Sequence, residues 1–198
     1  MLIMSRQQRR AYLTRLLPYL SGSLTLFTLG IVAGAVAVRQ IAGHADHLVE
    51  TLASFVKTFA GMPPWKLASA IFLNNALKTL MAILLGTVLG FVPVLFLLVN
   101  GMALGVAISL SIQARGLWAS LVSIVPHGVF ELPAVFLGTS IGLMLGNHSM
   151  RRLIGRSDTT IRAELGNGLK YYFTVILPLL LLAASVEAFI TAVLVSPR

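Results

Sequence analysis

Four ionisable side chains lie within long apolar stretches of the sequence: Lys78, His127, Glu131 and Glu187. An ionised side chain in the hydrocarbon of a bilayer costs several kcal/mol, about 2.5–3.5 even on the lenient insertion scales. Such residues are therefore found mainly where they face the interior of a bundle, pair with each other or serve a function. Histidine and carboxylates are ligands of zinc and other divalent first-row metals, and they also carry protons and cations through membranes.

His127 and Glu131 are four residues apart, which places them on one face of a helix. Pro126 and Pro133 lack a backbone N–H, so each frees a carbonyl one turn before it, and Gly128 loosens the backbone further. Irregular backbone at membrane depth is tolerated only where protein or a wet cavity surrounds it. The sequence therefore predicts a fourth membrane helix that is kinked or broken at Pro126/Pro133 and lines an interior site.

The neighbouring apolar segments bring matching polar groups: Asn74, Asn75, Lys78, Asn100 and Glu187. At a rise of about 1.5 Å per residue, Lys78, Asn100 and His127 each fall near the midplane of the bilayer. Glu187 falls nearer the outer end of the last helix. Depth alone thus allows these helices to converge on one polar centre.

Three interpretations of this centre stay open. It is a structural polar core, a cation or proton pathway, or a divalent-metal site, for example for zinc, with His127, Glu131 and Glu187 as ligands. In the pathway and core interpretations the polar residues are Asn74, Asn75, Lys78 and Asn100. The chain has no paired-histidine zinc-protease motif and no strong serine-nucleophile signature, so we expect no enzymatic activity.

Composition determines the fold class. Of the 198 residues, 57% are hydrophobic and 11% charged, with a mean hydropathy of +0.90, whereas soluble domains carry about 25% charged residues. Apolar runs at 20–38, 67–92, 94–112, 118–146 and 172–195 approach or exceed the roughly 20 residues that a helix needs to cross a bilayer. They lack the two-residue alternation of barrel strands. The sequence predicts one all-α integral membrane domain, residues 1–198, with about five transmembrane helices.

The net charge of +9 is distributed asymmetrically. Nine basic residues fall before the first helix or between the fourth and fifth, and five fall on the opposite side. The positive-inside rule then places the N-terminus in the cytoplasm and the C-terminus outside a prokaryotic cell membrane. This distribution argues against a nucleic-acid partner. Residues 1–18 are expected to form a basic interfacial segment, 44–61 an outer amphipathic segment and 147–170 an inner basic loop.

Glycines recur at four-residue spacing, which lets helix backbones approach closely in a membrane. The glycines expected at helix contacts are Gly101, Gly105, Gly128, Gly138, Gly142 and Gly146. Packing inside the bundle and a homodimer seam are both compatible with this pattern. The stripe at 138, 142 and 146 is the candidate for the seam, and we expect a homodimer.

Four short motifs follow one another: Phe-Leu-Asn-Asn at 72–75, Asn-Gly-Met-Ala-Leu-Gly at 100–105, Pro-His-Gly-Val-Phe-Glu-Leu-Pro at 126–133 and Glu-Ala-Phe-Ile-Thr at 187–191. In this order they resemble the SpoIIM (stage II sporulation protein M) family, also called DUF95. The motif positions carried over from the resemblance are Asn75, Asn100, Gly101, His127, Gly128, Glu131 and Glu187. The sporulation members help to assemble a peptidoglycan-remodelling complex through soluble and membrane partners.

The resemblance implies a non-enzymatic membrane scaffold or complex subunit with a buried polar, metal-binding centre as one option. Its expected partners are the lipid bilayer, a second copy of the chain and other membrane or cell-envelope proteins. The alternative is a small transporter or channel coupled to a cation or a proton.

Overall fold

The computed structural model describes residues 4–40, 62–156 and 160–191, without the side chains at 123–127, 130, 190 and 191. In these ranges the chain is helical apart from short connections, and no strand occurs. The elements are α1 (Arg6–Gln40), α3 (Pro64–Gly86), α4 (Phe91–Leu153), α5 (Ile161–Tyr171), the π-helical turn η1 (Tyr172–Ile176), α6 (Leu177–Val186) and the π-helical turn η2 (Glu187–Thr191). The predicted all-α membrane bundle is confirmed.

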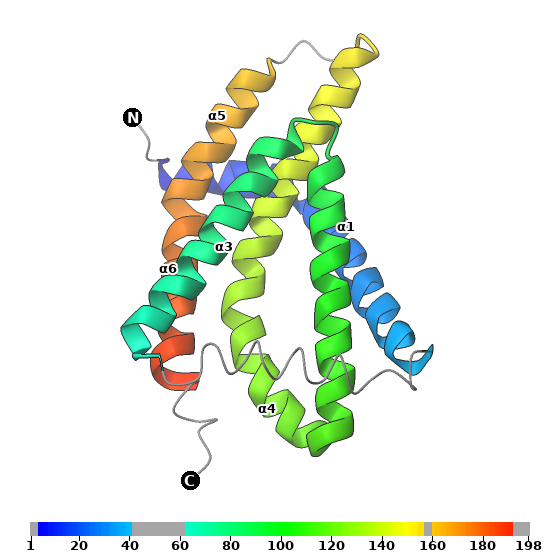
Figure 1. Ribbon diagram of the computed structural model, residues 1–198. Coiled ribbons are helices and arrows are strands. Elements are labelled where there is room, and N and C mark those ends of the chain that lie inside the picture. The colour runs from blue at the N-terminus through cyan, green and yellow to red at the C-terminus, as the bar shows by residue number, and fades with distance from the viewer. Residues whose placement is uncertain (1–3, 41–61, 157–159, 192–198) are drawn as a thin grey trace.

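The long helix α4 consists of two arms that meet at Gly116. This residue has φ 80° and ψ 169°, a conformation that glycine adopts readily because it has no Cβ. Figure 1 shows the first arm, residues 91–115, running down the bundle and the second arm, residues 117–153, returning beside it. The reversal falls between the predicted spans 94–112 and 118–146, where a connection is expected.

Four segments of the described chain are long and apolar enough to cross a membrane: α1, α3, residues 91–122 and residues 161–189. The second arm of α4 lies alongside them in Figure 1 and covers the fifth predicted span, 118–146. This agrees with about five transmembrane helices.

Of the kink or break predicted at Pro126/Pro133, the break is not present. Beyond Gly116 the backbone of α4 keeps helical dihedral angles through both prolines, although the second arm bends along its length in Figure 1. Proline removes one helical hydrogen bond but its fixed φ is itself helical, so a bend suffices to accommodate it. Within α4 only Gly116 leaves the helical region, and it does so between the predicted third and fourth membrane helices.

Two connections differ from the prediction. The turn between α3 and α4 covers residues 87–90 and so lies inside the predicted span 67–92, because Leu89 and Gly90 adopt left-handed φ values of 54° and 74°. Phe91 and Pro93 already belong to the first turn of α4, where a proline is tolerated.

The predicted inner loop 147–170 is also largely helical, since α4 extends to 153 and α5 begins at 161. The predicted outer segment 44–61 lies outside the described residues.

Glycines form two close helix contacts. A Cβ at Gly34 would overlap the carbonyl oxygen of Met102, and one at Gly105 would overlap that of Ile31, so α1 and the first arm touch backbone to backbone. The second arm packs against α3 in the same way, with Gly142 facing Gly86. The stripe considered as a homodimer seam is therefore buried within its own chain, against α3 at Gly138 and Gly142 and against the turn 87–90 at Gly146.

The second arm also meets α1 through buried polar and aromatic contacts. The hydroxyls of Ser23 and Ser140 are 3.1 Å apart, and both side chains are fully buried. The rings of Phe27 and Phe136 meet edge to face at a centroid distance of 5.2 Å. These contacts hold the second arm against α1 inside the bundle.

A candidate polar site in the middle of the bundle

A cavity of about 440 Å³ lies where α1, α3 and both arms of α4 approach one another. We call it the mid-span cavity. Its polar lining is Asn75 and Lys78 from α3, Asn100 from the first arm and Glu131 from the second. The remaining lining residues are Gly128 and six apolar side chains: Phe27, Phe96, Leu104, Val129, Leu132 and Val135. In Figure 1, α3 and the first arm diverge from their shared turn, with the second arm between them.

The polar side chains of α3 share one face. Asn75 and Lys78 are three residues apart, the spacing at which helix side chains are neighbours. Lys78 lies about 12 Å from the Gly86 end of α3, at about 1.5 Å per residue, and is exposed, so the cavity is open to the exterior of the bundle. Asn74 is exposed and does not line the cavity, but its amide donates to Oδ1 of Asn75 at 3.2 Å. Because Oδ1 of Asn75 accepts this bond, the amide nitrogen of Asn75 is the group available to donate into the cavity.

Asn100 and Glu131 complete the polar lining from α4, and both are half-buried. The amide nitrogen of Asn100 donates to the carbonyl oxygen of Phe96, one turn earlier, at 2.7 Å. Its side-chain oxygen is therefore the group that can accept a hydrogen bond in the cavity. A cation, a carboxylate and two amides thus surround one space, which suits a guest with both donors and acceptors.

The predicted site residues do not all meet. Glu187 begins η2, which packs on α3 and α4, and it does not line the mid-span cavity. The side chain of His127 lies outside the described residues. Among the side chains that the structure describes, no group of three or more His, Cys, Asp or Glu is placed to hold a metal ion. The divalent-metal centre remains a prediction.

One buried acid, Glu164 of α5, is not among the residues predicted from the sequence. Its residue is 5% exposed, and its Oε1 accepts from the guanidinium of Arg15 at 2.8 Å. This pair joins the beginning of α1 to α5. The signal available in the sequence is that Glu164 is one of only six acidic residues and lies in a strongly basic segment.

Comparison with known proteins supports the resemblance. The family model described as Stage II sporulation protein M matches residues 23–192, a range that includes every residue of the mid-span cavity. An uncharacterized protein of Methanocaldococcus jannaschii is 26% identical over 172 residues, which cover 85% of this chain and 91% of that protein. No solved structure matches the chain.

Proposed function

Because this chain belongs to the Stage II sporulation protein M family, we propose that it is a non-enzymatic subunit or scaffold of a membrane complex. The mid-span cavity is the place where a transmembrane segment of a partner inserts a polar side chain. The observation that carries this proposal is the exposure of Lys78 in the middle of a helix of membrane length.

The outer surface of α3 supports the proposal. Leu73, Leu77 and Met81 are 55%, 60% and 48% exposed and suit contact with lipid. Asn74 and Lys78 are also exposed and lie four residues apart on one face. Lipid tails offer these groups no hydrogen bond, so exposure of the ammonium group to hydrocarbon would cost about 2.5–3.5 kcal/mol or more. A carboxylate or amide from a partner helix satisfies both side chains.

Protection of a single cysteine tests this proposal directly, because the chain has no natural cysteine. Lys78→Cys and Leu77→Cys are matched variants, adjacent on α3 and both exposed. With a lipid-soluble maleimide, we expect Lys78→Cys to react in purified protein in nanodiscs and to be protected at least fivefold in native membranes. Leu77→Cys should react similarly in both preparations, since Leu77 is exposed and does not line the cavity.

The outcomes separate the competing functions. Equal labelling of Lys78→Cys in native membranes and nanodiscs contradicts a partner in the cavity. Fast labelling in native membranes by a charged, water-soluble thiol reagent instead supports the alternative, a cation- or proton-coupled transporter. Lys78 and Glu131 on one cavity are the observation that favours this alternative. A second copy of this chain is one candidate partner, and protection that persists in the purified protein but disappears on dilution would identify it.

We also propose an orientation. The start of α1, the end of the second arm and the start of α5 lie toward one end of the bundle, shown uppermost in Figure 1. Described basic residues collect at this end: Arg6, Arg9, Arg10, Arg15, Arg151, Arg152, Arg156, Arg162 and Lys170. The positive-inside rule assigns it to the cytoplasmic side of a prokaryotic cell membrane.

The metal prediction has its own test. If His127, Glu131 and Glu187 bind a divalent ion such as zinc, untagged protein purified in detergent should contain a stoichiometric metal. His127→Ala should lose it, because one of three protein ligands is removed. Elemental analysis of the two proteins side by side measures this, and absence of metal from the wild type would contradict the prediction.

A further inference from the structure

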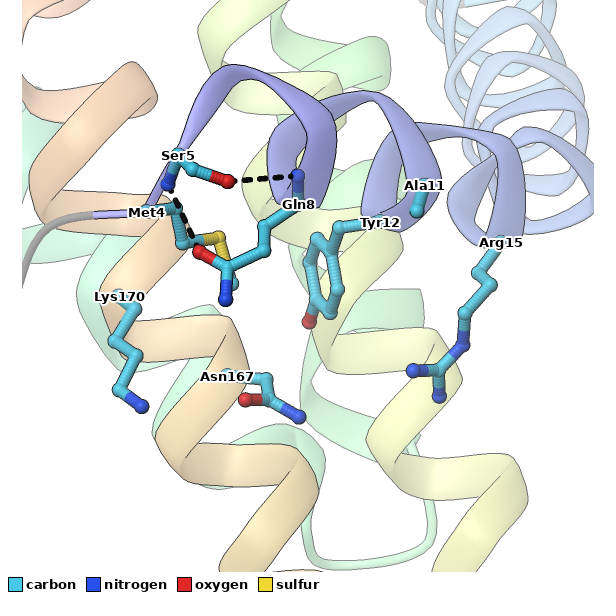
Figure 2. Close-up of a pocket in the computed structure, with 8 residues that line it drawn as sticks. All are labelled: Met4, Ser5, Gln8, Ala11, Tyr12, Arg15, Asn167 and Lys170. Atoms are coloured by element: carbon cyan, nitrogen blue, oxygen red, sulfur yellow. Dashed lines mark hydrogen bonds between the residues drawn. The ribbon is translucent and has the colours of Figure 1, made fainter.

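A second cavity, of about 530 Å³, lies between the beginning of α1 and α5. We call it the interfacial cavity. Figure 2 shows Gln8, Tyr12 and Arg15 extending from α1 toward the side where α5 carries Asn167 and Lys170. Met4, Ser5 and Ala11 complete the lining. None of these residues belongs to the mid-span cavity, so the two sites are independent.

The start of α1 orients a hydrogen-bond donor. The backbone nitrogen of Ser5 donates to Oε1 of Gln8 at 2.9 Å, and the backbone nitrogen of Gln8 donates to Oγ of Ser5 at 3.2 Å (Figure 2). This reciprocal pair is a capping box, which satisfies two backbone donors at the beginning of the helix. Since the side-chain oxygen of Gln8 is held by the cap, its amide nitrogen is the group left to bind a guest.

The hydroxyl of Tyr12 is a second donor of the interfacial cavity, and it is buried without a hydrogen-bond partner among the described residues. Its residue is only 4% exposed, yet its hydroxyl has no hydrogen-bond partner in the described structure. The ring is held by Tyr171, with centroids 5.1 Å apart, so the hydroxyl is fixed in place. A buried hydroxyl without a partner is unfavourable, and one on a cavity wall indicates a polar guest.

The charges of the interfacial cavity favour an anion. Arg15 and Lys170 are the charged residues of its lining. The guanidinium of Arg15 uses one nitrogen for Glu164, at 2.8 Å, and has further N–H groups to donate. Glu164 offsets the positive charge of Arg15, so Arg15, Lys170 and Glu164 together carry a net charge of about +1. This charge matches a guest with a single negative charge. Several donors around one cation are typical of phosphate recognition.

The location of the cavity identifies the source of the phosphate. At about 1.5 Å per residue, the 35 residues of α1 span about 52 Å, far more than the roughly 30 Å of hydrocarbon, so its basic first turns lie outside the apolar core. Figure 1 shows these turns running across the bundle. On the orientation proposed above, we propose that the interfacial cavity binds the phosphodiester headgroup of an anionic phospholipid from the cytoplasmic leaflet. Its donors are Gln8, Tyr12, Arg15 and Lys170.

Native mass spectrometry of delipidated protein tests this with three probes: phosphatidylglycerol, phosphatidylcholine and inorganic phosphate. We expect one phosphatidylglycerol to bind at least tenfold more tightly than phosphatidylcholine. Lys170→Gln should weaken it about fivefold, the effect of removing one cation near an anionic lipid. Arg151→Gln is the matched control, because Arg151 is exposed at the same end and does not line the cavity.

A melting curve of each variant without lipid verifies that it folds, and Asn167→Ala is a second variant that tests the lining without changing charge. Equal binding of the two lipids overturns the proposal, as does equal weakening by Arg151→Gln and Lys170→Gln. Tighter binding of inorganic phosphate than of phosphatidylglycerol shows that the ligand is a soluble anion and overturns the lipid assignment.

Discussion

Alanine at Gly34 is expected to destabilise the protein by about 1–3 kcal/mol, the typical cost of overpacking a tight contact. The added Cβ overlaps the carbonyl oxygen of Met102, and another backbone atom, the nitrogen of Val106, lies 3.0 Å away. Backbone cannot rotate aside as a side chain does, so α1 and the first arm of α4 must separate. The free energy of unfolding, measured by titrating detergent-solubilised protein with SDS, should fall accordingly.

Gly22→Ala is the matched control on the same helix. A Cβ at Gly22 has no atom within 4 Å. Alanine also loses less backbone conformational entropy on folding than glycine does. We expect it to stabilise the protein by about 0.5–1 kcal/mol. Equal free energies of unfolding for the two variants would show that the contact between α1 and the first arm is looser than the structure has it.

The glycines illustrate what the sequence could and could not predict. Four-residue spacing identifies the helix face that allows close approach, and Gly101, Gly105 and Gly142 all lie at such contacts. The spacing carries no information about which helix fills that face. A partner inside the chain and a partner in a second copy leave the same pattern, and only the arrangement of α3 against the second arm distinguishes them.

The prolines of the second arm show a second limit: the sequence predicted a kink or a break at Pro126/Pro133 and could not distinguish between the two. The loss of helical hydrogen bonds at Pro126 and Pro133 favours a break, whereas the fixed φ of proline is compatible with a bent helix. Gly116 has the conformational freedom to reverse the chain, and it adopts φ 80°. Proline limits a helix locally, but a reversal of direction needs a residue that can leave the helical region altogether.

The polar site was predicted in part. Depth along a helix follows from residue count, so the common level of Lys78 and Asn100 could be obtained from the sequence. Rotation about the helix axis and the choice of neighbour could not. Glu131 therefore joins Lys78 on the mid-span cavity, while Glu187, on a π-helical turn that packs against α3, α4 and α6, does not line it.

The remaining large effect is expected at the ion pair between α1 and α5. Arg15→Gln removes the cation from the carboxylate of Glu164, whose side chain is 6% exposed. Breaking a fully buried pair costs about 3–5 kcal/mol, and because the side chain of Arg15 is 46% exposed, we expect a smaller loss of about 2–3 kcal/mol. The same SDS titration, in detergent without added lipid, separates this effect from loss of a bound headgroup.

Arg10→Gln, at an exposed position on the same helix, is the control and should change the free energy of unfolding by less than about 0.5 kcal/mol.

The double variant Arg15→Gln/Glu164→Gln distinguishes a pair that stabilises the protein from one whose members only neutralise each other. Two amides of similar shape leave no buried charge, so most of the loss in Arg15→Gln should be recovered. Recovery would mean that the pair contributes little net stability and that the loss in Arg15→Gln is the cost of leaving the buried carboxylate of Glu164 without its cation. If the double variant is as unstable as the sum of the single variants, the two side chains do not interact and the 2.8 Å contact contributes nothing.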